Sequence, residues 1–152
     1  MDFLSQPNID FHIEDIEFQL QEPEKIIQWL SSCIQEENCI YQQLDFIFCS
    51  DSYLHQINLQ YLEHDTYTDI ITFDYSEFQE SQQKLSISGD LFISIDRVQE
   101  NAMALEIPFL QELLRVMIHG ILHLCTYKDG TEVEEKIMRA KEDFYLKKMS
   151  NF

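Results

Sequence analysis

The apolar segment from Leu113 to Leu124 constrains the fold more than any other feature of this chain of 152 residues. Its pattern fits a helix, and the helix is apolar all round, which is typical of one buried in a core. It nevertheless contains two histidines, His119 and His123. Buried histidines need polar partners, because an unpaired polar group in a core costs free energy. The segment therefore predicts a buried helix that carries a polar site.

His119 and His123 are four residues apart, so a helix places them one turn apart on the same face. Two imidazoles arranged in this way can bind one metal ion, with nitrogen–zinc distances of about 2.0–2.1 Å. Asp129 follows after a break in the helical pattern, where a bend would return its carboxylate to them. The histidine pair alone is weak support, and a core or capping role is the alternative. Gly120 favours the metal site, since glycine inside a helix costs about 1 kcal/mol relative to alanine and indicates a close approach there.

The same spacing argues against a protease. A third ligand six residues after the second histidine resembles the zinc site of metzincin proteases. Those enzymes use a glutamate next to the first histidine as general base. This chain has Gly120 at that position, so a protease is disfavoured.

Strand and helix patterns both alternate and cluster along the rest of the chain. Strands are expected at 9–20, 44–49, 68–75 and 87–94, where apolar and polar residues alternate or β-branched and aromatic residues gather. Helices are expected at 23–34, 51–62, 96–104 and 108–124 and from 131 onward, with starts at proline or at capping residues. The polar residues 76–84 are expected to form a loop or the tip of a hairpin. This order predicts an α+β fold with a mixed four-stranded sheet, about five helices, and a metal site on a buried helix and the following turn.

Length and composition predict one globular domain over 1–152, because 45% of the residues are hydrophobic and only three are glycine. No signal peptide and no apolar run of bilayer length is found, and the four cysteines include no CxxC pair. We therefore expect free thiols in a cytoplasmic protein. The net charge of −18 repels nucleic acid at long range, although solubility is its plainer explanation. Residues 128–148 hold six bases and six acids, so this window is neutral.

Several blocks together resemble the YbeY family of endoribonucleases. They are the run His119-Gly-Ile-Leu-His-Leu-Cys-Thr-Tyr-Lys-Asp129, the blocks Ile57-Asn-Leu-Gln-Tyr61 and Thr68-Asp-Ile-Ile-Thr-Phe73, and the strand Gly89-Asp-Leu-Phe-Ile-Ser94. Their order and spacing fit the family, and the likeness covers about residues 40–148.

The resemblance implies a function, because members of this family are single-strand-specific, metal-dependent endoribonucleases. It implies one Zn²⁺ per chain, held by His119, His123 and Asp129. It implies maturation of the 3′ end of small-subunit ribosomal RNA and a part in ribosome quality control. The expected partners are ribosomal RNA and the ribosome or a ribosomal protein, with no membrane and no DNA. No residue is assigned to catalysis, so the general base stays open.

The chain departs from the family pattern at several positions. The family usually has Gly at 126, Asp at 128 and His at 129, where this chain has Thr126, Lys128 and Asp129. A carboxylate is a legitimate zinc ligand, but its extra negative charge lowers the Lewis acidity of the metal. Thr126 adopts a positive φ less readily than glycine. Leu62 stands where the family usually has an arginine considered important for RNA cleavage, which leaves the phosphate-clamping role unassigned.

Two other functions stay open, because a fold class does not fix a reaction. The chain could be a non-catalytic ribosome-assembly protein with a structural zinc, or a metal hydrolase of another substrate.

The pairs Thr68–Asp69 and Gly89–Asp90 either line the cleft or serve as turn and strand-end residues. Asn58 is expected to cap a buried backbone group and Tyr127 to pack at the helix end, the alternatives being a bond to the ligand helix and base stacking. Surface positions are expected for His12, His55 and His64.

Overall fold

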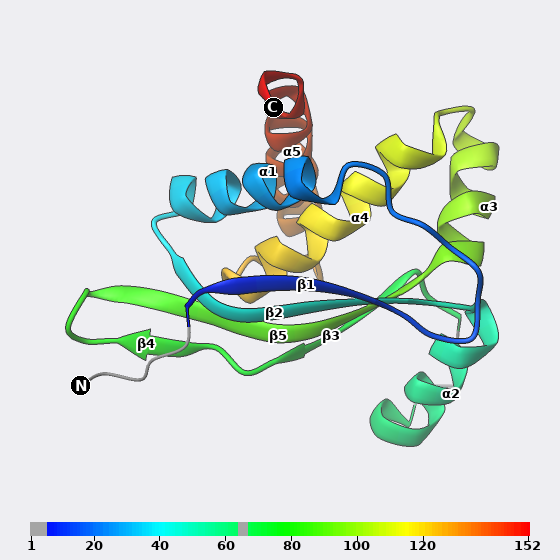
Figure 1. The fold of residues 1–152 in the computed structure, drawn as a ribbon, viewed down its shortest axis with the longest axis horizontal. Coiled ribbons are helices and arrows are strands. Elements are labelled where there is room, and N and C mark those ends of the chain that lie inside the picture. Colours follow the sequence, from blue (N-terminus) through cyan, green and yellow to red (C-terminus); the bar gives the residue numbers. More distant parts are fainter. Residues whose placement is uncertain (1–5, 64–66) are drawn as a thin grey trace.

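The computed structural model describes residues 6–63 and 67–152. Within these ranges the chain forms five α-helices and one mixed sheet (Figure 1). The strands are β1 (Asn8–Ile13), β2 (Ile40–Cys49), β3 (Ile70–Asp74), β4 (Glu77–Gln79) and β5 (Lys84–Ser94). The helices are α1 (Pro23–Glu36), α2 (Asp51–Leu62), α3 (Ile95–Leu105), α4 (Phe109–Leu124) and α5 (Glu132–Lys148), followed by a 3₁₀ turn at Met149–Asn151.

The sheet has the strand order β1-β2-β5-β3, with β4 also paired to β5. β2 is parallel to β1 and β5, whereas β3 and β4 are antiparallel to β5. The predicted α+β fold with a mixed sheet and five helices is confirmed. The sheet has five strands where four were expected, because part of 76–84 pairs with the beginning of β5. β4 has only three residues and no buried apolar side chain, so its sequence shows no pattern typical of a strand.

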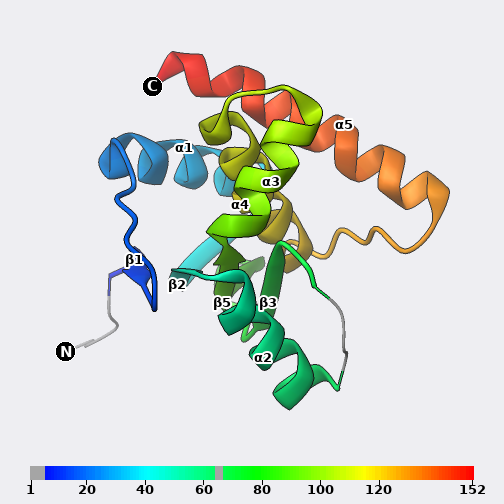
Figure 2. The same cartoon turned by 90° about the vertical axis from the view of Figure 1, so that its right-hand side faces the viewer.

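Helices cover both faces of the sheet (Figures 1 and 2). α1, α3, α4 and α5 lie on one face, and α2 lies on the other. The larger core joins the first group to residues such as Phe46, Leu91 and Ile93. A smaller cluster joins Leu54 of α2 to Ile71 of β3. β5 is therefore covered on both sides, which explains why its residues are mostly apolar.

Two expected boundaries differ from those observed. The first strand ends at Ile13 and not at residue 20, because the chain turns at Asp15, whose φ is 45°. The Asp15 carboxylate accepts hydrogen bonds from the backbone and hydroxyl of Ser50 and so ties this turn to the start of α2. The helix expected to be capped by Asp96 is capped by Ser94, whose hydroxyl accepts from the Arg97 N–H.

Two sequence-based expectations concern chemistry and environment. All four cysteines are buried free thiols, as expected. Among the described residues, no helix combines the length and the apolar character that crossing a bilayer requires.

Candidate metal centre

Gly120 lets α4 lie directly against the sheet. A Cβ atom at this position would lie 2.6 Å from Leu91 Cδ2 and 2.7 Å from Ile70 Cδ1. Such contacts are far inside van der Waals distance, so a side chain here would force Leu91 and Ile70, or the helix, to shift. The close approach predicted from this glycine is confirmed, and it places His119 beside β3.

A tight turn follows α4 and returns the chain to the histidines. Thr126 N–H bonds to the His123 carbonyl and Tyr127 N–H to the Leu122 carbonyl, the pattern of a Schellman motif. Thr126 occupies the position that normally holds glycine and has a φ of 80°. The turn thus forms with threonine in a conformation that disfavours β-branched residues. It carries Asp129 to the end of α4.

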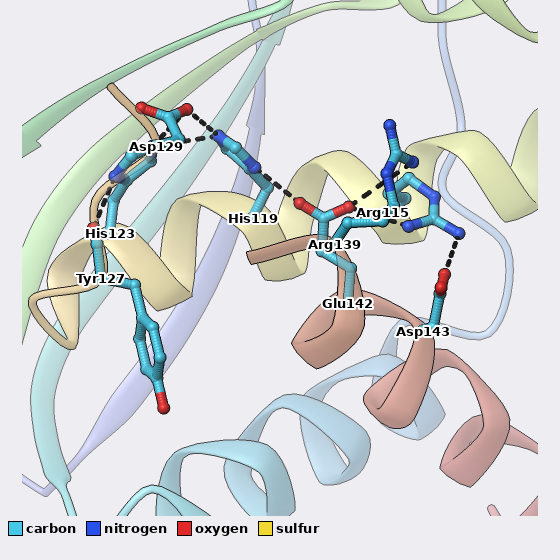
Figure 3. Close-up of polar contacts among 8 residues, drawn as sticks. All are labelled: Arg115, His119, His123, Tyr127, Asp129, Arg139, Glu142 and Asp143. Carbon is cyan, nitrogen blue, oxygen red and sulfur yellow. Dashed lines mark hydrogen bonds and ion pairs between the residues drawn. The ribbon is translucent and has the colours of Figure 1, made fainter. Parts of the chain in front are cut away.

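His119, His123 and Asp129 converge at this turn (Figure 3). His119 Nε2 lies 3.0 Å from His123 Nε2 and 3.3 Å from Asp129 Oδ2. His123 Nε2 lies 3.2 Å from the same carboxylate oxygen. All three side chains are half-buried, and their ligand atoms lie within 4.8 Å of one another, close enough to hold a metal ion.

These separations can be compared with the shape of a zinc site. A tetrahedron with arms of about 2.0–2.1 Å has edges of about 3.3–3.4 Å. The three observed separations are 3.0–3.3 Å, so the donor set is nearly preformed. The donor types also fit, because zinc accepts imidazole nitrogen and carboxylate oxygen.

The other ring nitrogens of the two histidines face oxygen acceptors. His119 Nδ1 lies 2.7 Å from Glu142 Oε2, and His123 Nδ1 lies 3.0 Å from the Tyr127 carbonyl oxygen. We therefore assign the Nδ1–H tautomer to both neutral rings. Their Nε2 lone pairs then face each other, an arrangement that a cation relieves.

A buried ion pair supports His119 from behind. Glu142 of α5 is 4% exposed, and its second oxygen accepts from Arg115 Nη1 at 2.8 Å. Arg115 also donates to Asp143 at 2.7 Å. Sequence reasoning missed this network, although Arg115 lies four residues before His119 on the same helix face and could have indicated it.

The charges of this network set the pKa values around it. Burial disfavours the charged form of His119, but the hydrogen bond and charge of Glu142, aided by Asp129 and Asp69, raise its pKa overall. Burial disfavours the Glu142 carboxylate, yet His119 and Arg115 lower its pKa. Burial raises the pKa of Asp69. Protons therefore compete with a metal ion for His119 as the pH falls.

Two cavities meet at the metal centre. One, of about 800 Å³, lies between α4 and α5, and the other, of about 580 Å³, lies between α2 and β3. The shared lining residues are Asp69, Ile70, His119 and Asp129. Thr68, Asn58 and Leu62 line the second cavity only.

The remaining candidates from the sequence fall into different places. Gly89 is not among the residues lining either cavity; a Cβ there would lie 2.6 Å from the Phe73 carbonyl oxygen, so it permits close strand packing. Asp90 accepts a hydrogen bond from the Tyr75 hydroxyl and lines neither cavity. Asn58 is 3% exposed and belongs to the second cavity wall.

Tyr127 packs on the core and His12 is exposed, as expected, whereas His55 is half-buried. Tyr127 points its ring away from the three ligands, and its hydroxyl donates to Glu37 at 2.7 Å (Figure 3). His12 pairs with Asp45 at 2.7 Å on the exposed part of β1. His55 stacks on Tyr67. The expectation for His64 concerns a position outside the described residues.

Comparisons with known proteins find relatives over nearly the whole chain. Residues 8–150 match the family model described as "Endoribonuclease YbeY". A protein of that name from Amoebophilus asiaticus is 49% identical over 143 residues, which are 94% of each chain. One from Flavobacterium psychrophilum is 50% identical over 91% of this chain and 94% of its own. The solution structure of a Thermotoga maritima protein shares the fold, with a TM-score of 0.63, 24% identity, and coverage of 93% of this chain and 89% of its own.

Proposed function

Because this chain belongs to the YbeY family of endoribonucleases, we propose that it cleaves single-stranded RNA with a metal ion held by His119, His123 and Asp129. It is accordingly a hydrolase that acts on RNA phosphodiester bonds. The observation that carries the proposal for the site is the convergence of these three ligand atoms within 4.8 Å. The family match over residues 8–150 supports the further proposal that 1–152 forms one such domain.

Zinc is the metal that the donor set fits best, and we propose one ion per chain. When bound, zinc supplies a Lewis acid for a phosphoryl oxygen and lowers the pKa of water. The protein's own contribution is orientation. Glu142 and the Tyr127 carbonyl hold the two imidazoles so that both Nε2 atoms face Asp129. Three protein ligands is also the number that catalytic zinc sites use.

The biological role that we propose is maturation of the 3′ end of small-subunit ribosomal RNA and ribosome quality control in the cytoplasm. Buried free thiols suit such a reducing compartment. The net charge of −18 makes unaided capture of RNA unfavourable. A basic ribosomal protein would overcome this repulsion, so we propose association with the ribosome. Recovery of no ribosomal component with the tagged chain from a lysate would contradict it.

The function is tested by measuring bound zinc and cleavage of single-stranded RNA for the native chain, His123→Ala and Asp129→Ala. We expect the native chain to bind one zinc and cleave RNA, and both variants to lose metal and cleavage together. His12→Ala is the matched control, because His12 lies on β1, at the opposite edge of the sheet from β3. It should keep both properties.

Two outcomes would favour the alternatives. Zinc binding without any RNA cleavage, with unfolding on metal removal, would indicate an assembly protein with a structural zinc. Zinc-dependent hydrolysis of another phosphodiester, with RNA left intact, would indicate a hydrolase of a different substrate. A native chain that binds no metal near pH 7 would overturn the proposed site.

A further inference from the structure

Glu112 is a buried polar residue in the wall of the first cavity. Its side chain is buried, since the residue is 6% exposed. Among the described residues, its Oε1 is the buried side-chain oxygen or nitrogen that lacks a hydrogen-bond partner. Buried polar atoms in folded proteins are almost always paired, so an exception points to a partner that the protein alone does not supply.

The position of Glu112 relates it to the metal centre. It lies in the first turn of α4, seven residues before His119. Two helical turns separate them, so both lie on the same helix face, about 10 Å apart along the axis. Both line the cavity of about 800 Å³ between α4 and α5. A ligand in this cavity can therefore touch Glu112 while an attached group reaches the metal centre.

The cavity walls combine an apolar part with many charged side chains. Leu105, Val116 and Met138 supply apolar wall, and the Arg139 side chain, 63% exposed, lies at the rim. The apolar part can contact the face of a flat, heteroaromatic ring, while a polar group at its edge fixes the orientation of the ring. Proteins that act on single-stranded RNA place unstacked bases in pockets of this kind and read their edges by hydrogen bonds.

Two simpler explanations for the buried Glu112 carboxyl group are less satisfactory. Acidic residues in a first helical turn are stabilised by the helix dipole, but an exposed carboxylate would gain the same benefit without being buried. A second metal ion would need a further set of ligands. Among the described residues, His119, His123 and Asp129 form the group whose ligand atoms are close enough to share an ion, and Glu112 is outside it.

We propose that this cavity is a nucleobase subsite, in which Glu112 accepts a hydrogen bond from the exocyclic amino group of a nucleotide beside the cleaved bond. This inference rests on the proposed endoribonuclease function. Adenine, cytosine and guanine carry such an amino group. Uracil carries carbonyl oxygens on both sides of its N3–H, and these repel a carboxyl oxygen. The subsite therefore disfavours uracil.

In the free protein, burial of the Glu112 carboxyl group without a hydrogen-bond donor disfavours its charged form. Burial raises the pKa of Glu112, and Asp69 raises it further, while Arg115 acts in the opposite direction. The carboxyl group is thus poorly solvated until a donor arrives. Removing such an unpaired group is neutral or stabilising for the fold. Loss of base preference without loss of stability is the property that separates a recognition residue from a structural one.

The test compares Glu112→Leu with the wild type on single-stranded RNAs that differ only in the nucleotide beside the cut. We expect the wild type to cleave RNAs with adenosine or cytidine there about tenfold better than RNAs with uridine, measured as kcat/KM, as one charge-assisted hydrogen bond allows. Glu112→Leu should lose this preference, keep its zinc and unfold at an equal or higher denaturant concentration. Glu24→Leu is the matched control, because Glu24 is an exposed carboxylate in the first turn of a helix, α1, and lines neither cavity. It should keep the preference.

A second measurement needs no cleavage. Adenosine and uridine 5′-monophosphates are titrated separately into the zinc-loaded chain and followed by NMR, and adenosine monophosphate should bind more tightly in a Glu112-dependent way. An inactive wild type that still shows this binding would overturn the proposed function and support the subsite. Active enzyme whose base preference survives Glu112→Leu, or a variant that unfolds at a lower denaturant concentration, would overturn the subsite and leave the function intact.

Discussion

At the scale of single residues, Thr126 holds a conformation that its side chain disfavours. Its φ of 80° places it in the left-handed region at the C′ position of α4. A non-glycine residue there costs about 1–2 kcal/mol. The turn that returns Asp129 to the histidines is therefore formed in spite of its central residue, and the hydrogen bonds from Thr126 and Tyr127 to α4 hold it.

Replacing this residue with glycine should stabilise the protein. For Thr126→Gly, relief of the strained backbone should raise the free energy of unfolding by about 1 kcal/mol. The greater backbone entropy of glycine in the unfolded chain offsets part of this gain. Urea unfolding measures it. The control is Lys128→Gly, because Lys128 is not among the residues with positive φ, and this change should destabilise by about 0.5–1 kcal/mol. Destabilisation by both changes would contradict the assignment of strain to Thr126.

Glu142 should set how tightly His119 binds a metal. For Glu142→Ala we expect zinc affinity to fall about 10–100-fold, because the partner that orients the imidazole is lost. Glu142→Gln should lose less, since its amide oxygen still accepts from Nδ1–H. Competition with a chromogenic chelator measures both. Asp143→Ala is the control, because Asp143 contacts Arg115 but has no bond to His119. An equal loss in that variant would argue against a specific role for Glu142.

At the scale of elements, Glu37 joins three segments that are distant in sequence. It lies at the end of α1 and accepts hydrogen bonds from Tyr127 after α4 and from Tyr145 and Lys141 of α5. The Tyr127 carbonyl in turn orients His123. Helix packing and the metal centre are thus coupled through one buried carboxylate.

This carboxylate predicts a loss of stability in acid. Burial opposes its charge, but the hydrogen bonds from Tyr127, Tyr145 and Lys141 lower its pKa below the ordinary 4.5. Its stabilisation is therefore fully present above pH 4.5 and is lost as the pH falls through the lowered value. Glu37→Gln should be about 2 kcal/mol less stable at pH 7, and the difference should shrink below pH 4.5. Denaturant unfolding from pH 7 to pH 3 checks this, and a constant difference would contradict it.

At the scale of the whole molecule, charge is distributed unevenly around the centre. The chain carries −18, but the neutral window 128–148 contains Asp129 and the cavity-lining part of α5. Of the residues that line the first cavity, however, seven are acidic and three are lysine or arginine, so the site where RNA would bind is itself acidic. The rest of the surface also repels a polyanion at long range.

Salt should therefore help this enzyme capture free RNA. Raising the salt from about 10 mM to about 150 mM shortens the screening length from about 30 Å to about 8 Å. We expect KM for a single-stranded RNA to fall over this range while kcat stays constant, the opposite of a basic nuclease. Steady-state kinetics with a labelled oligonucleotide measures it. A KM that rises with salt would show that local cations outweigh the net charge.

The sequence by itself determined the local features of this protein. A buried helix, the placement of His119 and His123 one turn apart, the close approach at Gly120 and the helix caps at Ser50 and Thr131 all follow from the period or backbone needs of one segment. The position of Asp129 after the end of the helix suggested it as the third ligand, and the family blocks supported that expectation.

Only the tertiary structure decided which distant residues complete the site. Glu142 is 23 residues from His119, and Tyr127 and Glu37 are 90 apart. No periodicity encodes such pairs, because they depend on which face of α5 packs on α4 and where α1 ends. The same applies to β4, which exists through pairing with β5, and to the unpartnered oxygen of Glu112. Local patterns fix elements, but burial and long-range partners arise only when the elements are packed together.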